Sequence, residues 1–308
     1  MKTGSQTTSD PEVLQPEVFL VVLNYNGGKD TLECLASLEK LSYPRLTVLL
    51  ADNGSTDGSA VLVAERFPEV HVSENRENLG YAAGNNPAIR FAMSKGADYV
   101  VLLNNDTVID DDEMITSLID FERSRRAGPV SPRIDYMGTE TVWMVGARLT
   151  FLTGRSYHLG KGKRSSDFSS CAPYEVQYVT GCCMLLSRHL LEEVGLLDED
   201  YFFYYEDADY CFRAAAAGRP SYVVPGSVVH HRKSASSGTV GTDRVSRFQA
   251  YHMGRGSMIF AGKRLSGARK ASFKLAQWTL TLAYVAVMSR SSRAVGEYVR
   301  GLRDGLRT

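Results

Sequence analysis

Short apolar runs alternate with segments of helical periodicity from residue 18 to about residue 123. Each apolar run is rich in Val, Leu or aromatic residues; Tyr99–Leu103, for example, runs directly into Asn104-Asn105-Asp106. Runs this short and continuous suit strands that are covered on both faces, as in a parallel sheet flanked by helices. The pattern therefore predicts a β-α-β-α-β-α-β-α order, an open sheet and right-handed crossovers. The predicted strands are 18–23, 46–51, 70–72 and 99–103, and the predicted helices end near residues 41, 67, 95 and 123.

Polar residues follow three of these predicted strands directly. They are Asn24-Tyr25-Asn26, Asp52-Asn53 and Asn104-Asn105-Asp106. Ligands of open α/β sheets bind beyond the carboxyl ends of the strands, so Asp106 lies where a metal or phosphate ligand is expected. Turn chemistry is the simpler interpretation of any one Asn-Gly or Asp-Asn pair. Three polar strand ends on one edge favour a binding site.

The region after residue 128 has a different pattern. Residues 129–176 are rich in Gly, Ser, Arg and aromatic residues, including Trp143, and they predict irregular strands and loops. An apolar run at 179–186 leads into a short helix, with Ser187 as its predicted N-cap and Gly195 as its predicted stop.

A helix rich in carboxylates is predicted after the five consecutive aromatic residues 201–205. Glu206, Asp207 and Asp209 fall in its first turn, where the helix dipole favours negative charge. Asp209 is spaced to pair with Arg213 on the next turn. The aromatic residues would form an apolar wall that raises a carboxylate pKa toward the range of a general base. The alternative is an ordinary helix with an acidic first turn.

Two adjacent histidines, His230 and His231, close the next apolar segment. The runs 222–224 and 228–230 are predicted to flank a turn at Pro225-Gly226. A lone histidine is more often structural than a ligand, whereas a pair at a strand end before a Ser/Gly-rich basic loop favours contact with a metal or a phosphate. Either histidine fills this role equally well.

The formal net charge of zero conceals a strong asymmetry. Residues 1–242 hold 22 Lys and Arg against 32 Asp and Glu, whereas residues 243–308 hold 13 against 3. A basic tail of this density predicts an anionic partner, either nucleic acid or anionic lipid. Leu275–Met288 carries no charge, and it is shorter than the roughly 20 residues that span a bilayer. An interfacial amphipathic helix and a helix packed in the core both remain open; the apolar content favours lipid, and nucleic-acid binding is not expected.

The other compositional features point to an ordinary intracellular protein. The five cysteines contain no C-x-x-C arrangement, so they indicate neither a zinc site nor a disulfide framework. Residues 1–17 are polar, lack the apolar centre of a signal peptide, and are expected to be a disordered lead-in. The expected localisation is cytoplasmic, with the basic tail allowing peripheral attachment to the inner face of the membrane.

Taken in order, the motifs resemble those of inverting glycosyltransferases of family two, which have the GT-A fold, and within them the rhamnosyltransferase-type branch. The resemblance covers roughly residues 18–240. It rests on residues 22–27, 52–59, 78–86, 102–107, 181–188, 203–209 and 231–238. Each motif alone is weak, and their order makes the resemblance specific.

The resemblance implies an α/β fold of the GT-A type, with a Rossmann-like, mostly parallel sheet flanked by helices and a helical C-terminal extension. The glycosyltransferase domain would span 18–242, with a nucleotide-sugar half at 18–127 and an acceptor half at 128–242. The basic extension would span 243–308.

The resemblance also implies a role for individual residues. Asn104-Asn105-Asp106 stands at the D-x-D motif, with Asp106 as the principal metal ligand and His231 completing the metal or diphosphate contacts. An Asn in the leading position implies a less strongly held metal. Asp207 would be the catalytic base, paired with Glu206. The residues implied to bind the nucleotide sugar are Asn24, Tyr25, Asn26, Asp52, Asn53, Gly80, Asn85, Asn104 and Asn105, and those implied on the acceptor side are Trp143, Gly181, Cys182 and Asp209.

The implied reaction is transfer of one sugar, rhamnose or another hexose, from a UDP or dTDP donor with inversion. Hard oxygen ligands favour Mg or Mn as the divalent ion. The acceptor would be a glycan, a lipid-linked sugar or a small molecule. The chain lacks the Gln-x-x-Arg-Trp motif of processive members, which favours single addition. A sugar-phosphate nucleotidyltransferase and a non-catalytic binding protein are the alternatives.

Overall fold

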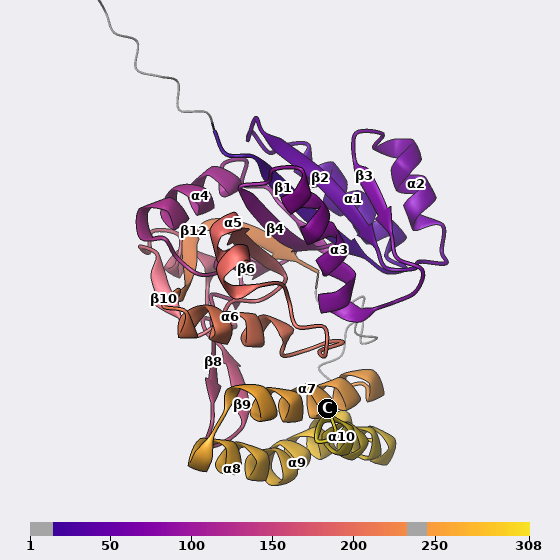
Figure 1. The fold of residues 1–308 in the computed structure, drawn as a ribbon, viewed down its shortest axis with the longest axis vertical. Coiled ribbons are helices and arrows are strands. Elements are labelled where there is room, and N and C mark those ends of the chain that lie inside the picture. Colours follow the sequence, from indigo (N-terminus) through magenta and orange to yellow (C-terminus); the bar gives the residue numbers. More distant parts are fainter. Residues whose placement is uncertain (1–14, 233–244) are drawn as a thin grey trace, which may run out of the picture.

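The apolar runs of the N-terminal half form the parallel side of one mixed sheet (Figure 1). The computed structural model describes residues 15–232 and 245–308, so residues 1–14 of the expected lead-in and 233–238 of the last motif lie outside the described residues. The parallel strands are β1 (Val18–Asn24), β2 (Leu46–Asp52), β3 (His71–Glu74) and β4 (Tyr99–Asn104), and helices α1 (Gly28–Leu38), α2 (Ser59–Arg66) and α3 (Gly80–Ser94) connect them. The predicted alternation is confirmed here. The first helix ends about three residues before its predicted end.

The register of the parallel strands brings the polar strand ends together. Asn24 of β1 lies opposite Asp52 of β2, and Leu23 lies opposite Asn104 of β4. Val100, Val101 and the two leucines of β4 are almost completely buried, because helices cover both faces of the sheet. The hydrophobic strands thus position a row of polar side chains at their carboxyl ends.

The second half of the chain extends the same sheet with both strand directions. Its elements are β5 (Thr107–Val108), α4 (Met114–Arg125), β6 (Val130–Tyr136), β7 (Val142–Met144), β10 (Tyr174–Val176), β11 (Cys183–Ser187), α5 (Arg188–Val194), α6 (Glu206–Ala216) and β12 (Ser221–His231). The strand order is β10-β12-β6-β11-β4-β1-β2-β3, and β11 runs antiparallel to both β4 and β6. Ser187 caps α5 as predicted, accepting a hydrogen bond from the backbone N–H of Leu190.

The predicted turn at Pro225-Gly226 is wrong. Residues 221–231 form the single strand β12, and its pairing with β6 shifts register between Val224 and Val228. The guanidinium group of Arg133 donates to the carbonyl oxygen of Pro225 at 2.6 Å and so holds the bulge. A proline and a glycine interrupt pairing with the neighbouring strand as readily as they reverse a chain, and here they interrupt it.

Helices from the C-terminal region form a separate layer below the sheet in Figure 1. They are α7 (Arg247–Arg264), α8 (Gly267–Ala276), the π-helical turn η2 (Gln277–Thr281), α9 (Leu282–Ser289) and α10 (Ser292–Gly305). A second apolar cluster, which includes Met258, Tyr298 and Leu302, holds these helices together. The hairpin of β8 (Ala147–Thr150) and β9 (Arg155–His158) reaches from the sheet to this layer.

Candidate functional site

Asn24 is the hub at the end of β1. Its amide nitrogen donates to Asp52 Oδ1 at 2.7 Å and to Ser59 Oγ at 2.8 Å. Its amide oxygen accepts from Thr31 Oγ1 at 2.7 Å and from Asn105 Nδ2 at 3.1 Å. The side chain is buried and engaged by the protein itself. Asn24, Asp52 and Asn105 therefore hold three strand ends in one arrangement, and their predicted nucleotide contacts stay a prediction.

Asn53 is a second hub, one residue beyond β2. Its nitrogen donates to Asn78 Oδ1 and to the carbonyl oxygen of Gly80, both at 3.0 Å. Its oxygen accepts from Asn75 Nδ2 at 3.2 Å and from the backbone N–H of Leu79 at 3.1 Å. Asn53 thus fixes the loop that leads into α3.

Gly80 and Asn85 lie where α3 begins. Gly80 has φ +79°, and a Cβ there would lie 2.2 Å from the carbonyl oxygen of Phe202. Only glycine permits this approach, and the neighbouring Tyr81 N–H donates to the same oxygen at 2.7 Å. Asn85 is buried; its Nδ2 donates to the carbonyl oxygen of Tyr81 at 2.9 Å, and its Oδ1 has no hydrogen-bond partner among the described residues. Gly80 therefore packs the start of α3 against the loop before α6.

Tyr25, one of the predicted nucleotide-binding residues, has 45% of its surface exposed. Asn26 next to it has φ 51°, and its Oδ1 accepts from the backbone N–H of Thr56 at 2.8 Å. This contact ties the loop after β1 to the loop after β2. Tyr25 is left projecting with its ring available to a ligand.

Asp106 and His231 lie together just beyond the end of β4. His231 Nε2 is 3.2 Å from Asp106 Oδ1, and both side chains are buried. The pairing of β5 with β12 sets His231 opposite Thr107, and the ring of Trp143 lies 4.7 Å from the imidazole, centroid to centroid. Because neighbouring residues of a strand face opposite sides, His230 points away from this position. The structure thus brings His231 to Asp106.

The chemistry of this pair fits a divalent ion. Asp106 Oδ1 is buried and accepts no hydrogen bond from the described residues. A carboxylate oxygen and an imidazole nitrogen are both ligands of Mn²⁺ and Mg²⁺. Across residues 15–232 and 245–308, however, no three His, Cys, Asp or Glu side chains are grouped to hold a metal. A divalent ion that has only one or two protein ligands typically completes its coordination with the phosphates of the substrate.

Glu206 and Asp207 begin α6, and their environments separate their pKa values. Asp207 Oδ1 accepts from the backbone N–H of Ala208 at 2.7 Å, and Oδ2 accepts from that of Gly181 at 3.4 Å. Burial raises the pKa of Asp207 to about 6. Burial and the neighbouring Asp207 charge raise the pKa of Glu206 well above its usual value, and its Oε2 has no hydrogen-bond partner within the described part of the chain. Asp207 is therefore the member of the pair that ionises first.

Gly181 and Cys182 connect Asp207 to the end of β4. The hydroxyl of Tyr81 donates to the carbonyl oxygen of Gly181 at 2.5 Å. The backbone N–H of Asn104 donates to the carbonyl oxygen of Cys182 at 2.9 Å. Burial, followed by the negative charge of Asp106, raises the pKa of the Cys182 thiol. The Asp106 and Asp207 carboxylates thus border the same two-residue segment.

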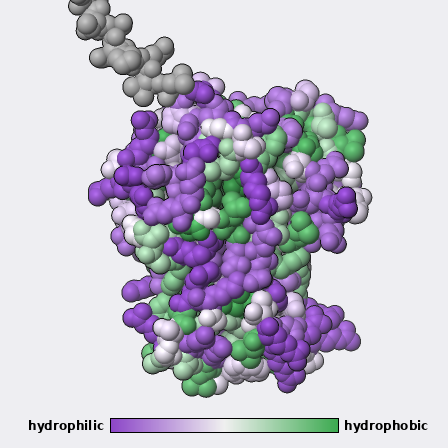
Figure 2. All heavy atoms as spheres, viewed as in Figure 1, coloured by the Kyte–Doolittle hydropathy of each residue, from purple (hydrophilic) through white to green (hydrophobic). Residues whose placement is uncertain are grey.

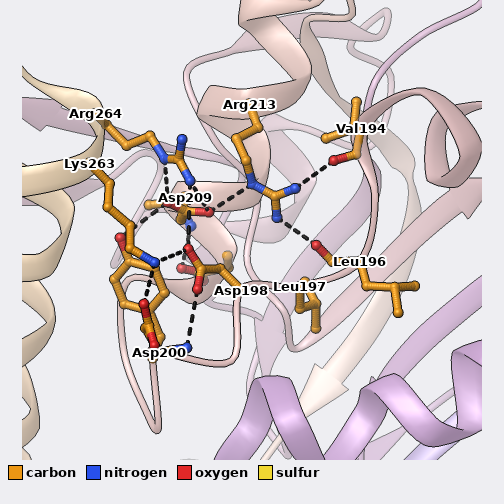
Figure 3. A network of polar contacts seen from close by, with 12 residues as sticks. Val194, Leu196, Leu197, Asp198, Asp200, Asp209, Arg213, Lys263 and Arg264 are labelled. Carbon is orange, nitrogen blue, oxygen red and sulfur yellow. Dashed lines mark hydrogen bonds and ion pairs between the residues drawn. The ribbon is translucent and has the colours of Figure 1, made fainter. Parts of the chain in front are cut away.

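Asp209 has a structural role, which Figure 3 shows in detail. It is fully buried, and Arg213 Nε donates to its Oδ2 at 2.9 Å, as the helical spacing predicts. Arg264 Nε of α7 and the hydroxyl of Tyr201 donate to its Oδ1 at 2.5 Å and 3.1 Å. Both carboxylate oxygens are occupied, so these contacts support no acceptor-side role.

Lys263, next to Arg264, extends the same network. Its Nζ lies 2.6 Å from Asp198 Oδ2 and 2.5 Å from Asp200 Oδ2. The C-terminal layer is therefore tied by charge to the helix that carries Asp207 and to the loop before it (Figure 3).

Comparison with known proteins identifies the family. The model for glycosyl transferase family 2 matches residues 19–195. The chain belongs to glycosyl transferase family 2. It is 31% identical, over 85% of its length and 88% of the relative's, to the N-acetylglucosaminyl-diphospho-decaprenol L-rhamnosyltransferase of Mycobacterium tuberculosis. It is also 22% identical to the dTDP-rhamnosyl transferase RfbF of Shigella flexneri, over 95% of its length and 98% of the relative's.

The fold is that of the GT-A glycosyltransferases. The mannosyltransferase PcManGT from Pyrobaculum calidifontis, solved in complex with GDP-Man and Mn²⁺, superposes with a TM-score of 0.61 at 21% identity, over 94% of this chain and 81% of that chain. The family 2 match ends before α6, so the segment with Asp207 lies outside it.

Some contacts around the candidate site involve residues to which the sequence pattern assigned no role. Tyr81 lies within the motif 78–86, but nothing in its spacing indicates its hydrogen bond to Gly181. Arg264 lies 55 residues beyond its partner Asp209. A contact at that separation has no local signature, so only the folded chain reveals it.

Proposed function

We propose that this family 2 glycosyltransferase moves one rhamnose or related hexose from a nucleoside diphosphate to an acceptor hydroxyl, with inversion at the anomeric carbon. The observation that carries the proposal is Asp207, a half-buried carboxylate with a pKa of about 6, held by the Gly181 N–H beside the segment that also borders Asp106. An ionised carboxylate with a pKa just below neutrality is well matched to a general base.

Asp207 would remove the acceptor proton while the acceptor oxygen bonds to the anomeric carbon. The nucleoside diphosphate then leaves from the opposite face of the sugar, so a single displacement inverts the configuration. Glu206 would keep its proton beside Asp207, because a second charge in the same buried position is costly. The hubs at Asn24 and Asn53 would keep the strand ends rigid around the donor.

Asp106 and His231 would hold a Mg or Mn ion, and Asn104 leaves the leading position of that motif without a charge. A bound divalent ion supplies positive charge that neutralises the departing diphosphate. Trp143 would keep His231 oriented by packing on its ring. The Mn²⁺ in the PcManGT structure supports this assignment.

We further propose dTDP-rhamnose as the donor and a sugar attached to a lipid diphosphate as the acceptor. The donor follows from the RfbF relative, and the acceptor follows from the mycobacterial relative, whose name specifies such a lipid. The expected role is an addition step in polysaccharide or glycoconjugate synthesis.

The direct test is a donor screen with purified protein and Mn²⁺. We expect dTDP release from dTDP-rhamnose at a rate at least about tenfold above the rates for UDP sugars, and chelation by EDTA should reduce it strongly. Asp106→Asn should lower the rate by roughly a hundredfold or more, since loss of a metal-held charge removes several kcal/mol of stabilisation. Asp110→Asn is the matched control, because Asp110 is exposed and, among the described residues, forms an ion pair only with Lys40. Full activity of Asp106→Asn would remove Asp106 from the mechanism.

The rate should also depend on pH through Asp207. Because the base must be ionised, we expect kcat to fall about tenfold per pH unit below a midpoint near 6 and to level off above it. Tyr81, Tyr178 and Cys211 also face Asp207; burial raises the pKa of each, and they stay protonated across this range.

The Glu206→Gln variant is the control for this profile. Since Glu206 is expected to be neutral where Asp207 is ionised, its replacement should leave the acidic limb in place. A limb that disappears in Glu206→Gln would assign the base to Glu206 instead, and a flat profile from pH 5 to 8 would exclude both carboxylates.

A further inference from the structure

The outer face of α8, η2 and α9 is apolar and has no protein partner among the described residues. On the inner face, Phe273 and Val285 are buried. On the outer face, Leu275, Leu280 and Val287 expose 66%, 54% and 70% of their surfaces. The sequence left two interpretations of this segment, a core helix and an interfacial helix. In the structure the segment has one buried apolar face and one exposed apolar face.

The turn of the β8–β9 hairpin adds to this face. Leu152 at the turn is 76% exposed. Gln277 Nε2 donates to the carbonyl oxygen of Gly154 at 2.7 Å, and the guanidinium of Arg269 lies 5.9 Å from the ring of Phe151. These contacts place the turn against α8 and η2. Leu152, Leu275, Leu280 and Val287 are hereafter called the docking face; hydrophobic residues are visible at the lower edge of the molecule in Figure 2, where α8 lies in Figure 1.

The chain segment that carries most of the docking face has charges of one sign. Residues 265–296 contain no Asp or Glu. The cations in this stretch are Arg269, Lys270, Lys274, Arg290 and Arg293. The described residues contain no ion pair for these five, whereas Lys263, just before this stretch, pairs with Asp198 and Asp200. The exposed apolar side chains are thus accompanied by basic side chains that have no carboxylate partner among the described residues. A partner that is both apolar and anionic would match this combination.

We propose that the docking face rests on a bilayer containing anionic lipids, with the exposed Leu and Val side chains in the headgroup region and the basic side chains on lipid phosphates. No helix of the described residues is long and apolar enough to cross a membrane, so the contact is at the surface. A second copy of this chain would bring like charges together, and nucleic acid offers nothing to the apolar centre. The bilayer satisfies both features.

The hairpin also connects the docking face to the candidate site. Trp143 packs on His158 of β9, with ring centroids 5.2 Å apart, and on His231 beside Asp106. Where the proposed lipid-linked acceptor is correct, docking would set the height of the site above the membrane. That consequence rests on the proposed function, whereas membrane binding itself does not.

Flotation of the full chain with phosphatidylcholine vesicles, with and without phosphatidylglycerol, tests the proposal without donor or acceptor. Binding should be at least tenfold stronger with phosphatidylglycerol and should weaken as salt is raised. Leu275→Ser combined with Val287→Ser should lower it tenfold or more. The matched control is Val61→Ser with Leu62→Ser on α2, where both side chains are also exposed, and it should bind like the wild type.

Two results would overturn the proposal. One is equal binding of both double variants to anionic vesicles. The other is a wild-type dimer, measured by light scattering, that the Leu275/Val287 variant converts to a monomer, since a second copy would then cover this face. Transfer to a water-soluble acceptor should be unchanged in the Leu275/Val287 variant, which separates failure of docking from failure of the proposed reaction.

Discussion

Asp207→Asn is expected to lower kcat for sugar transfer by roughly a thousandfold while donor binding is preserved. General-base catalysis contributes about 10²–10⁴ in rate, and Asn matches Asp in shape but cannot accept a proton. Its oxygen still accepts from the backbone N–H groups of Ala208 or Gly181, so the position of the side chain should be retained. Single-turnover transfer and donor titration by calorimetry measure the two quantities separately. A variant with more than a tenth of the wild-type rate would show that another group removes the proton.

The stability of the same variant provides the control. Burial raises the pKa of Asp207 from 3.8 to about 6. The folded state therefore holds the Asp207 proton more tightly than the unfolded state does. Stability from this group is present at low pH and is lost as pH rises through about 6. Asn cannot ionise, and we expect the variant to be more stable than the wild type at pH 7.5 by about 3 kcal/mol, with no difference below about pH 4. A lower unfolding temperature at pH 7.5 would indicate misfolding as the cause of lost activity.

Asp209→Ala should cost about 3–5 kcal/mol of unfolding free energy, because removing one partner of a buried ion pair leaves uncompensated buried charge. Arg213 keeps its hydrogen bonds to the carbonyl oxygens of Val194 and Leu196, at 2.8 Å and 2.7 Å. Arg264 keeps only a longer ion pair, 3.6 Å from Asp198. Urea unfolding at pH 7.5 measures the loss.

Asp110→Ala is the matched control for this loss. Its exposed pair with Lys40 should contribute less than about 1 kcal/mol. Because Asp209 lies two residues after Asp207 on α6, sugar transfer should also fall in Asp209→Ala. A loss of stability no larger than that of Asp110→Ala would show that the network in Figure 3 contributes nothing beyond surface pairing.

Most of the N-terminal half could be predicted because its signals are local. Val100 to Leu103 are buried and are followed at once by polar residues. The strand and the polar residues at its end can therefore both be predicted from one continuous stretch of sequence. The acidic first turn of α6 and its Asp209–Arg213 pair are equally local, since helical spacing alone brings the two residues together. The Pro225-Gly226 segment was mispredicted because a bulge and a turn use the same residues and differ only in whether a neighbouring strand pairs with both sides.

The candidate site, like the fold, could be predicted only in part from the sequence. The sequence indicated Asp106 and Asp207 as functional carboxylates. Its residue pattern did not choose between His230 and His231, although the family resemblance pointed to His231, and strand pairing with β5 places His231 beside Asp106. Ligand contacts of Asn24 and Asn53 stay a prediction, and the structure adds that both side chains hydrogen-bond to neighbouring loops. Whether an amide faces a ligand or the protein depends on neighbours brought in from distant segments.

The strand and helix order of the first half, the row of polar strand ends and the basic, acid-free segment near the C-terminus can all be inferred from the chain alone. Each follows from side-chain chemistry at neighbouring or helically spaced positions. The packing of distant segments is needed to bring Arg264 to Asp209, the Gly181 N–H to Asp207, and the β8–β9 turn to η2. Those contacts join segments that are far apart in the chain. They form only when the sheet, the hairpin and the C-terminal helices pack together.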